Sequence, residues 1–292
     1  MASQVVINGL LLGAMLGLVG LGFSLVWGIL NIVNLAHSAL IMFGAYLTFF
    51  LFAQLNLDPF LSLPISMAAL FLLGFVLQKY VINLVMRAPL LVTFVLTFGF
   101  ETFFTSLARA FFTGDQRAVT PAYNAAALTL GDAILNWMKL GAFAVALMLT
   151  GAMYLFMRYT RTGNAIRAVG MDADAARLMG VDVARSYALT YGLSAAVAGA
   201  AGTLLSMWYS FTPDSFGIYN IRAFAVVVLG GLGSIPGALI GGLVFGLLDQ
   251  AISTGSIGDF QLGALKEALI FLALVVILVV RPTGLLGKEG YR

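Results

Sequence analysis

The sequence has few of the residues from which enzyme sites are built. Its 292 residues include no cysteine and a single histidine, His37. Without cysteine there is no disulfide framework, no thiol nucleophile and no cysteine metal site, and one histidine cannot form a histidine-rich metal centre. No Ser/His/acid set and no paired carboxylates stand at a useful spacing, so hydrolase chemistry is not favoured.

Charged residues are also scarce. Asp, Glu, Lys and Arg make up 9% of the chain, and 61% of it is hydrophobic. A soluble domain carries roughly 25% charged residues. A chain of this length cannot hide so much apolar surface in one core, because most ionic residues of a soluble protein are needed outside. The composition therefore excludes an ordinary soluble enzyme, a disordered chain and a nucleic-acid binder.

A nucleotide-binding loop is missing as well. No segment fits the phosphate-loop pattern G-x-x-x-x-G-K-[ST], and residues 284–289 lack both its spacing and its hydroxyl residue. The Gly231-Leu232-Gly233 run resembles half of a dinucleotide fingerprint but lacks the βαβ context. We therefore expect no cofactor and no metal on this chain, and expect any ATP with its Mg²⁺ to be bound by a partner chain.

The sequence does contain a series of long apolar segments. A membrane-spanning helix needs about 20 mostly apolar residues. Such segments occupy residues 5–29, 35–53, 60–83, 90–111, 137–157, 187–210 and 263–281, and a further apolar stretch covers 221–251. They predict an all-α, polytopic membrane protein with about eight helical segments and a single transmembrane domain over 1–292. The first segment has no basic residues before it and no cleavage site after it, which indicates an integral helix.

The placement of Lys and Arg predicts the orientation, because cytoplasmic loops are enriched in both. The loop 158–186 holds five arginines and is placed in the cytoplasm. Counting spans then puts the N-terminus and the loop 112–136 outside. It puts the turn 31–37, the loop with Lys79 and Arg87, and the tail inside. Ten of the fifteen Lys and Arg residues fall on the cytoplasmic side, so the basic pI is an orientation signal rather than a sign of acidic ligands.

The stretch 221–251 is too long for one crossing, since a single helix would run about 46 Å at 1.5 Å per residue. Residues 230–237 read Gly-Gly-Leu-Gly-Ser-Ile-Pro-Gly, which favours a break. We predict two short helices, 221–231 and 235–251, that enter and leave on the same side, as a re-entrant hairpin or as two thin crossings. Irregular backbone at membrane depth needs protein or water around it, so this region is expected beside the transport path.

Polar residues inside spans are costly and indicate function or specific packing. Glu101 lies near the middle of the fourth span, with Arg109 two turns further on and Thr93, Thr97 and Thr105 along a polar stripe. A structural carboxylate tied to a partner helix and a residue of the substrate path are equally good interpretations of Glu101.

Other polar and small residues favour structural roles. Asn34 is interpreted as a helix cap and His37 as a hydrogen-bonded structural group. Asp249, near a helix end, is expected to be solvated. Gly9, Gly13 and Gly17, and likewise Gly233, Gly237 and Gly241, recur every four residues, which favours close packing of helices.

The loop 158–186 carries the best functional signal. Asp172 is a plausible N-cap, residues 173–179 favour helix, and Gly180 suits a helix end. Leu178, Met179 and Val181 make the end of this helix apolar. Positive-inside anchoring explains the arginines but not an ordered helix with an apolar end, whereas a docking helix for a soluble partner explains both.

Several stretches, taken together and in this order, resemble the permease subunits of ABC importers for branched-chain amino acids, and more closely the smaller of the two paired permeases. They are residues 8–13, 31–37 continuing into 42–46, 162–181, 228–238 and 281–287. Ser38 and Asp249 stand where relatives often have glycine and glutamate, which weakens any transfer of substrate identity.

The resemblance implies a non-catalytic permease subunit of an ATP-driven importer in a bacterial cytoplasmic membrane. It also implies a second permease, which is a paralogue, two ATP-binding subunits on the cytoplasmic loops, and a periplasmic substrate-binding protein. The ATPase-coupling residues would be Gly163, Arg167, Asp172, Asp174, Ala176, Arg177, Leu178, Met179, Gly180 and Val181. The candidate substrate path comprises Asn31, Asn34, Glu101, Asn220, Gly230, Gly231, Gly233 and Pro236. Two alternatives are an importer of urea, short amides or aromatic acids, and an ion-coupled carrier with Glu101 as its ion site.

Overall fold

The computed structural model describes residues 2–86, 88–125, 127–130, 133–257, 260–281 and 283–287. Arg87, Lys288 and Arg292 of the orientation count lie outside the described residues. Within them, seven helical segments are long and apolar enough to cross a membrane. Six are α1 (Ala2–Leu30), α2 (His37–Leu55), α5 (Leu90–Phe112), α6 (Trp137–Tyr159), α9 (Val183–Trp208) and α11 (Ile235–Thr254), and the seventh is α3 (Pro59–Leu77) with its continuation through a π-helical turn (Gln78–Ile82) and α4 (Asn83–Val85).

Shorter elements connect and flank these helices. They are α7 (Arg161–Met171), α8 (Ala173–Leu178), α10 (Gly217–Gly230), α12 (Lys266–Val280) and the 3₁₀ segments Ala122–Ala125, Pro213–Phe216 and Leu262–Leu265. Two antiparallel hairpins are formed by β1 (Ala127–Leu130) with β2 (Ala133–Asn136) and by β3 (Ser256–Ile257) with β4 (Phe260–Gln261). The predicted all-α polytopic fold is confirmed. The expected last span, 263–281, is α-helical only over α12.

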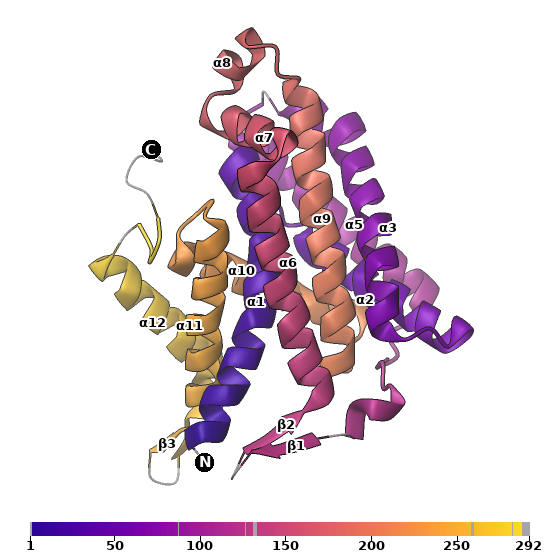
Figure 1. The fold of residues 1–292 in the computed structure, drawn as a ribbon, viewed down its shortest axis with the longest axis vertical. Coiled ribbons are helices and arrows are strands. Elements are labelled where there is room, and N and C mark those ends of the chain that lie inside the picture. Colours follow the sequence, from indigo (N-terminus) through magenta and orange to yellow (C-terminus); the bar gives the residue numbers. More distant parts are fainter. Residues whose placement is uncertain are drawn as a thin grey trace.

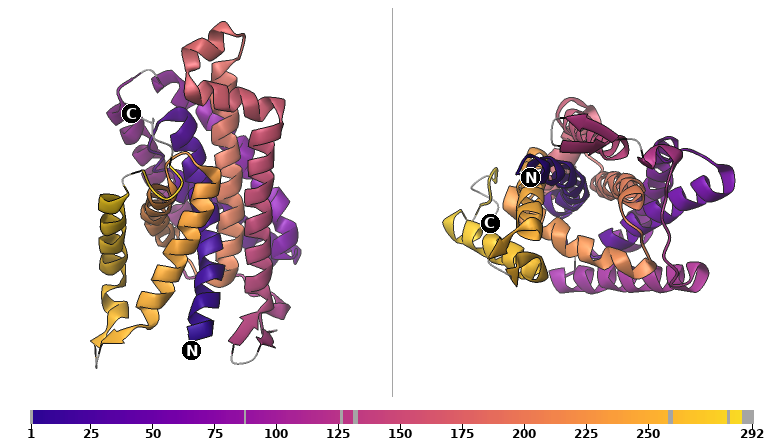
Figure 2. Two further views of the ribbon diagram at one scale, coloured as in Figure 1. Left: turned by 60° about the vertical axis from the view of Figure 1, so that its left-hand side comes forward. Right: turned by 90° about the horizontal axis from the view of Figure 1, so that it is seen from below.

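The helices run between two ends of an elongated bundle (Figure 1). One end carries α7 and α8, and the other carries the N-terminus, the β1–β2 hairpin and β3. This separates the arginine-rich loop from the N-terminus and from the loop 112–136, as the sequence predicted. Figure 2 shows α12 running back from the β3 end along the outside of the bundle.

Helices α1 and α9 form the buried centre, and glycines set the contact between α1 and α11. A Cβ atom placed on Gly13 would lie 2.6 Å from the Cα atom of Leu243, and one placed on Gly246 would lie 2.4 Å from the Cα atom of Gly13. Only glycine permits so close an approach of two helix backbones. The packing role predicted for the first glycine series is therefore confirmed.

The predicted break in 221–251 is present and lies between α10 and α11. Gly231 and Gly233 adopt positive φ values of 106° and 76°, a backbone conformation that favours glycine. The Ser234 hydroxyl accepts a hydrogen bond from the Gly237 amide (3.1 Å) and so caps α11. α11 runs from the break towards β3, the end at which α9 also finishes (Figures 1 and 2). The stretch thus leaves on the side from which it enters, and α10, at 14 residues, is too short to span a bilayer.

The turn after α1 differs from its prediction. His37, expected in a cytoplasmic turn, is fully buried, and its Nε2 atom donates a hydrogen bond to the Val19 carbonyl (2.9 Å). Val19 lies about 16 Å below the end of α1 at 1.5 Å per residue. Residues 31–36 therefore return into the bundle without helical structure, and α2 begins inside it. The placement of 31–37 at the surface was wrong, whereas the structural role of His37 is confirmed.

Candidate functional site

The re-entrant segment 31–36 is the first part of the candidate site. The Asn31 amide closes the last turn of α1 and the Ala36 carbonyl begins α2, but the groups between them lie outside regular helix and need other partners at membrane depth. Asn220 on α10 binds the segment and the start of α2 together: its Nδ2 atom donates to the Leu35 carbonyl and to the Ser38 hydroxyl (2.8 Å), and its Oδ1 atom accepts a hydrogen bond from the Ser38 amide (3.0 Å). A side chain from a distant helix thus caps the start of α2.

Two further helices hold the same segment. The Thr97 hydroxyl on α5 donates to the Val33 carbonyl (2.9 Å) and accepts from the Leu35 amide (3.3 Å). The Tyr191 hydroxyl on α9 donates to Oδ1 of Asn34 (2.9 Å). The prediction that Asn34 caps α2 was therefore wrong. Its side chain receives a hydrogen bond from α9 instead, because the chain carries it into the bundle rather than along the surface.

Two polar groups near the segment have no partner within the part of the chain that the structure describes. The Nδ2 atom of Asn34 is buried and makes no hydrogen bond within the described part of the chain. Glu101 lies one helical turn from Thr97 on α5, is half-buried, and forms no ion pair or hydrogen bond among the described residues. Arg109, expected on the same stripe, pairs instead with Asp214. Unpartnered polar groups at this depth are where a polar ligand or a second subunit would be accommodated.

The predicted path residues fall into two groups. Asn34 and Asn220 meet at the re-entrant segment, and Glu101 lies one turn from it. Asn31 is exposed at the end of α1 with φ 54°. Gly230, Gly231, Gly233 and Pro236 form the break between α10 and α11, at a different place in the bundle.

The break makes close contacts with α1 and with residues 283–287, and α7 in turn lies against α1. A Cβ atom on Gly28 of α1 would lie 2.6 Å from the Cα atom of Gly233, and one on Gly170 of α7 would lie 3.2 Å from the Gly28 carbonyl oxygen. Residues 283–287 cover its other side, where the amides of Leu285 and Leu286 donate to the last carbonyls of α10 (2.8 and 2.9 Å). The break therefore contacts α1 and the segment after α12 directly, and it is linked to α7 through α1.

The loop 158–186 is the second part of the candidate site. The predicted caps are confirmed: Oδ1 of Asp172 accepts from the amides of Asp174 and Ala175 (both 2.9 Å), and Gly180 ends α8 with φ 83°. The helix α7 before it was missed. Its signal is present in Thr160, whose hydroxyl accepts from the Gly163 amide (2.9 Å), followed by apolar residues that are buried on one face.

This loop has its own small core and an exposed apolar tip. Ala176 is buried against Val169 and Val183. Met171, Leu178 and Met179 are 85–89% exposed. Gly163 is required at the α6–α7 corner, because a Cβ atom there would lie 2.4 Å from the Phe156 carbonyl oxygen. The remaining predicted coupling residues make local contacts: Arg177 pairs with Asp174 (2.9 Å) and Arg167 donates to Asn164, while Val181 packs beside the small core.

A group of ion pairs at the other end of the bundle was not predicted as such. Asp249 is 2% exposed, and its Oδ2 atom lies 3.0 Å from Nζ of Lys266 at the start of α12. Arg222 on α10 pairs with Glu267 (2.5 Å). The solvated interpretation of Asp249 is wrong, because Lys266 covers the carboxylate. The sequence signal was an arginine within the apolar stretch 221–251 and a Lys-Glu pair at the start of the last span.

Comparison with known proteins identifies the family of this chain. A family model described as "Branched-chain amino acid transport system / permease component" matches residues 5–280. The chain belongs to this family. The BraD permease protein of a high-affinity branched-chain amino acid transport system in Pseudomonas aeruginosa is 31% identical to this permease, over 98% of this chain and 95% of the relative. The LivH permease protein of Escherichia coli (strain K12) is 30% identical over the same shares.

The similarity extends to an archaeal protein. A probable LivH permease protein from Methanocaldococcus jannaschii is 27% identical, over 94% of this chain and 89% of the relative. No solved structure matches the chain. With its apolar helices, the family membership makes this chain a multi-pass membrane protein and a transport permease subunit that is not itself catalytic, and it confirms the resemblance drawn from the motifs.

Proposed function

We propose that this permease is one transmembrane subunit of an ATP-driven importer for branched-chain or related amino acids. Its expected partners are a paralogous second permease, two ATP-binding subunits that hold ATP and Mg²⁺, and a periplasmic substrate-binding protein. The single observation that carries the proposal is the tip of the loop 158–186. The helices α7 and α8, each with a side-chain N-cap, present Met171, Leu178 and Met179 to solvent. Exposed apolar patches of this kind mark protein docking sites.

The proposed orientation follows the charges. The tip and its five arginines are assigned to the cytoplasm, where they would meet an ATP-binding subunit, and the N-terminus and β1–β2 hairpin to the outside. The Asp172–Val181 part of the loop is then the coupling element. Gly163, Arg167, Asp174, Arg177 and Gly180 shape and hold it, and Ala176 fills its core.

The contacts described above supply a mechanical route inward. A push on α8 moves α7, whose Gly170 lies against Gly28 of α1, and Gly28 in turn contacts Gly233 in the break. The break ends α10, and α10 holds the re-entrant segment through Asn220. We infer that the bundle switches between outward and inward access as a two-state equilibrium biased by ATP. Asn34 and Glu101 would then line the path, and Gly230, Gly231, Gly233 and Pro236 would form its hinge.

The test uses the loop tip in the assembled transporter. Replacing Leu178 and Met179 together by aspartate should abolish substrate-stimulated ATP hydrolysis and ATP-driven uptake in proteoliposomes. The matched control swaps the two residues (Leu178→Met with Met179→Leu) and so keeps the surface apolar. Ala176 is unsuitable for this test, because it is buried and a charged residue there would disrupt the loop itself. Normal coupled uptake by the double aspartate variant would refute the docking role.

One observation favours a second candidate function. Glu101 lacks a partner among the described residues, as the ion site of a secondary transporter would when empty. A gradient-driven uptake by the permease alone, without ATP, and its loss in Glu101→Gln would establish that function. Competition by urea, short amides and aromatic acids in the ATP-driven assay separates the alternative substrates.

A further inference from the structure

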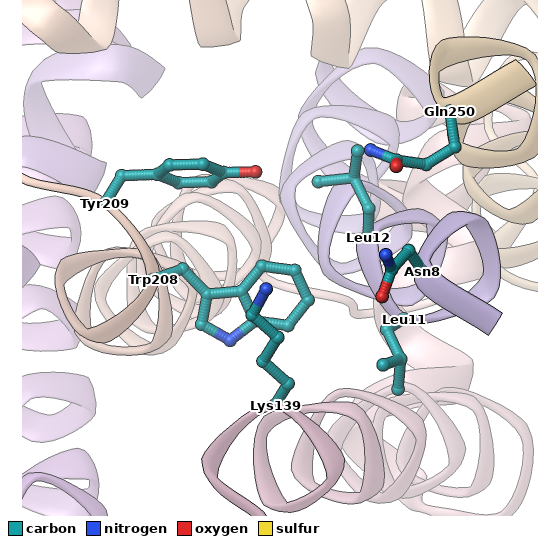
Figure 3. A pocket seen from close by; sticks show the side chains of 7 residues that line it. All are labelled: Asn8, Leu11, Leu12, Lys139, Trp208, Tyr209 and Gln250. Carbon is teal, nitrogen blue, oxygen red and sulfur yellow. The ribbon is translucent and has the colours of Figure 1, made fainter. Parts of the chain in front are cut away.

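A cavity of about 80 Å³ lies at the end of the bundle opposite α7 and α8. It is surrounded by α1, α6, α11 and the end of α9, and polar side chains from each of these four elements point into it (Figure 3). They are Asn8, Lys139, Trp208, Tyr209 and Gln250. So polar a lining is unusual within a bundle that is otherwise apolar, and it indicates a hydrophilic occupant.

Most of the available groups in this cavity are hydrogen-bond donors. The Nζ atom of Lys139 lies 5.2 Å from the centre of the Trp208 ring and forms no ion pair with a carboxylate in the described part of the chain. The indole nitrogen of Trp208 is buried without a hydrogen-bond partner among the described residues. The acceptor oxygen of Asn8 is occupied by Gln4 (3.1 Å).

Tyr209 adds another donor. Burial, together with the nearby Asp249 carboxylate, raises the pKa of Tyr209, so its hydroxyl keeps its proton at neutral pH. The Lys139 ammonium and the Tyr209 phenol both line this cavity and match a ligand that accepts hydrogen bonds. A carboxylate is such a ligand.

The size of the cavity limits which carboxylate-bearing ligand it can hold. A water-sized group takes roughly 10–15 Å³ of such volume, so the cavity admits the carboxylate, ammonium and Cα of an amino acid but not a whole leucine. The cavity is partly open, and Tyr209 in its lining is 48% exposed, so the side chain of a bound amino acid can extend outside it. We propose that this cavity binds the α-carboxylate of the incoming amino acid, with Lys139 as its ion-pair partner. This inference rests on the proposed function and adds an outer recognition site that reads the amino-acid head group rather than its side chain.

The experiment uses Trp208 as the reporter. In the assembled transporter, Trp27→Phe and Trp137→Phe leave Trp208 as this permease's single tryptophan. The partner subunits' tryptophans are controlled by a parallel titration of the complex with Trp208→Phe added. We expect L-leucine to change the Trp208 emission in a saturable way, because the ligand draws the Lys139 ammonium from the ring, and L-leucinamide, which lacks the carboxylate, to have no effect.

Two lysine variants and one control sharpen the result. Lys139→Met should raise the apparent Kd for leucine by about tenfold or more, since a hydrogen-bonded charge is lost, and Lys139→Arg should restore binding to within a few-fold. Lys79→Met is the matched control: Lys79 also lies over an aromatic ring, that of Tyr80 at 5.2 Å, but does not line this cavity. If the tryptophan variants do not assemble, binding of radiolabelled leucine to the Lys139 variants replaces the fluorescence readout.

Several results would overturn the proposal. They are an equal response to leucinamide, unchanged leucine binding in Lys139→Met, equal competition by inorganic phosphate, or a response to phosphatidylglycerol vesicles in place of leucine. Failure of the proposed function looks different, because ATP-driven uptake would then be absent while the leucine titration persists. Conversely, uptake that depends on Leu178 and Met179 without a leucine response at Trp208 overturns only the cavity assignment.

Discussion

Replacing Asn220 by leucine tests whether the re-entrant segment is held as described. Leucine has the same number of side-chain heavy atoms in the same branched arrangement, so the change removes hydrogen bonds without opening a cavity. Three bonds are lost, to the Ser38 amide, the Leu35 carbonyl and the Ser38 hydroxyl. At about 0.5–1.5 kcal/mol each, the free energy of unfolding should fall by about 1.5–4.5 kcal/mol. The loss should reach the upper end of this range because the Ser38 amide and Leu35 carbonyl lie where water is scarce.

The assay is denaturant unfolding of the purified complex, followed by tryptophan fluorescence, together with ATP-driven uptake. Asn164→Leu is the control for the unfolding measurement, because Asn164 is exposed on α7 and loses only one exposed hydrogen bond, from Arg167, which should cost no more than about 0.5 kcal/mol. We expect Asn220→Leu to lose uptake even where the complex still folds, since the start of α2 is no longer fixed to α10. Unchanged stability and normal uptake in Asn220→Leu would refute the reasoning.

Three further predictions follow from single contacts. Lys266→Met should leave the buried Asp249 carboxylate unpaired and lower the free energy of unfolding by about 3–5 kcal/mol, as measured by the same denaturation. If the additional change Asp249→Asn restores stability, the unpaired charge is the cause; if it does not, that explanation is contradicted. Gly28→Ala should uncouple ATP hydrolysis from uptake, because its Cβ would lie 2.6 Å from Gly233. The control Gly151→Ala has open space around it and should behave as wild type. If both variants hydrolyse the same amount of ATP per substrate taken up, the route through the break is refuted. Gly163→Ala should destabilise the loop, seen as faster limited proteolysis at 158–186, and unchanged cleavage would show that the α6–α7 corner tolerates a side chain.

Local sequence signals predicted much of the fold. The spans follow from apolar length, the break at 230–237 from its glycines and proline, and the caps of α8 from Asp172 and Gly180. Each of these depends on residues that are neighbours in the chain. The helix α7 has such a signal too, in Thr160, but the alanine-rich segment after it carries the more obvious helix pattern.

The features that could not be predicted depend on distant partners. The descent of 31–36 into the bundle is stabilised by Thr97, Tyr191 and Asn220, which are 60 or more residues away in sequence. From the sequence, two asparagines and a histidine after a helix look like a surface turn. Asp249 likewise appears solvated until α12 folds back and places Lys266 over it. In both cases a local polar pattern was interpreted without the tertiary contact that gives it its role.

The bonds between α10 and residues 283–287 also constrain how the protein is made. The carbonyls of Leu229 and Gly230 receive the amides of Leu285 and Leu286, which the ribosome adds 56 residues later. At 5–20 residues per second, the end of α10 waits roughly 3–11 s for these partners. Until then the glycine break stays uncapped while the nascent chain is still being inserted. The break between α10 and α11 is thus among the last parts of the bundle to be completed during biosynthesis.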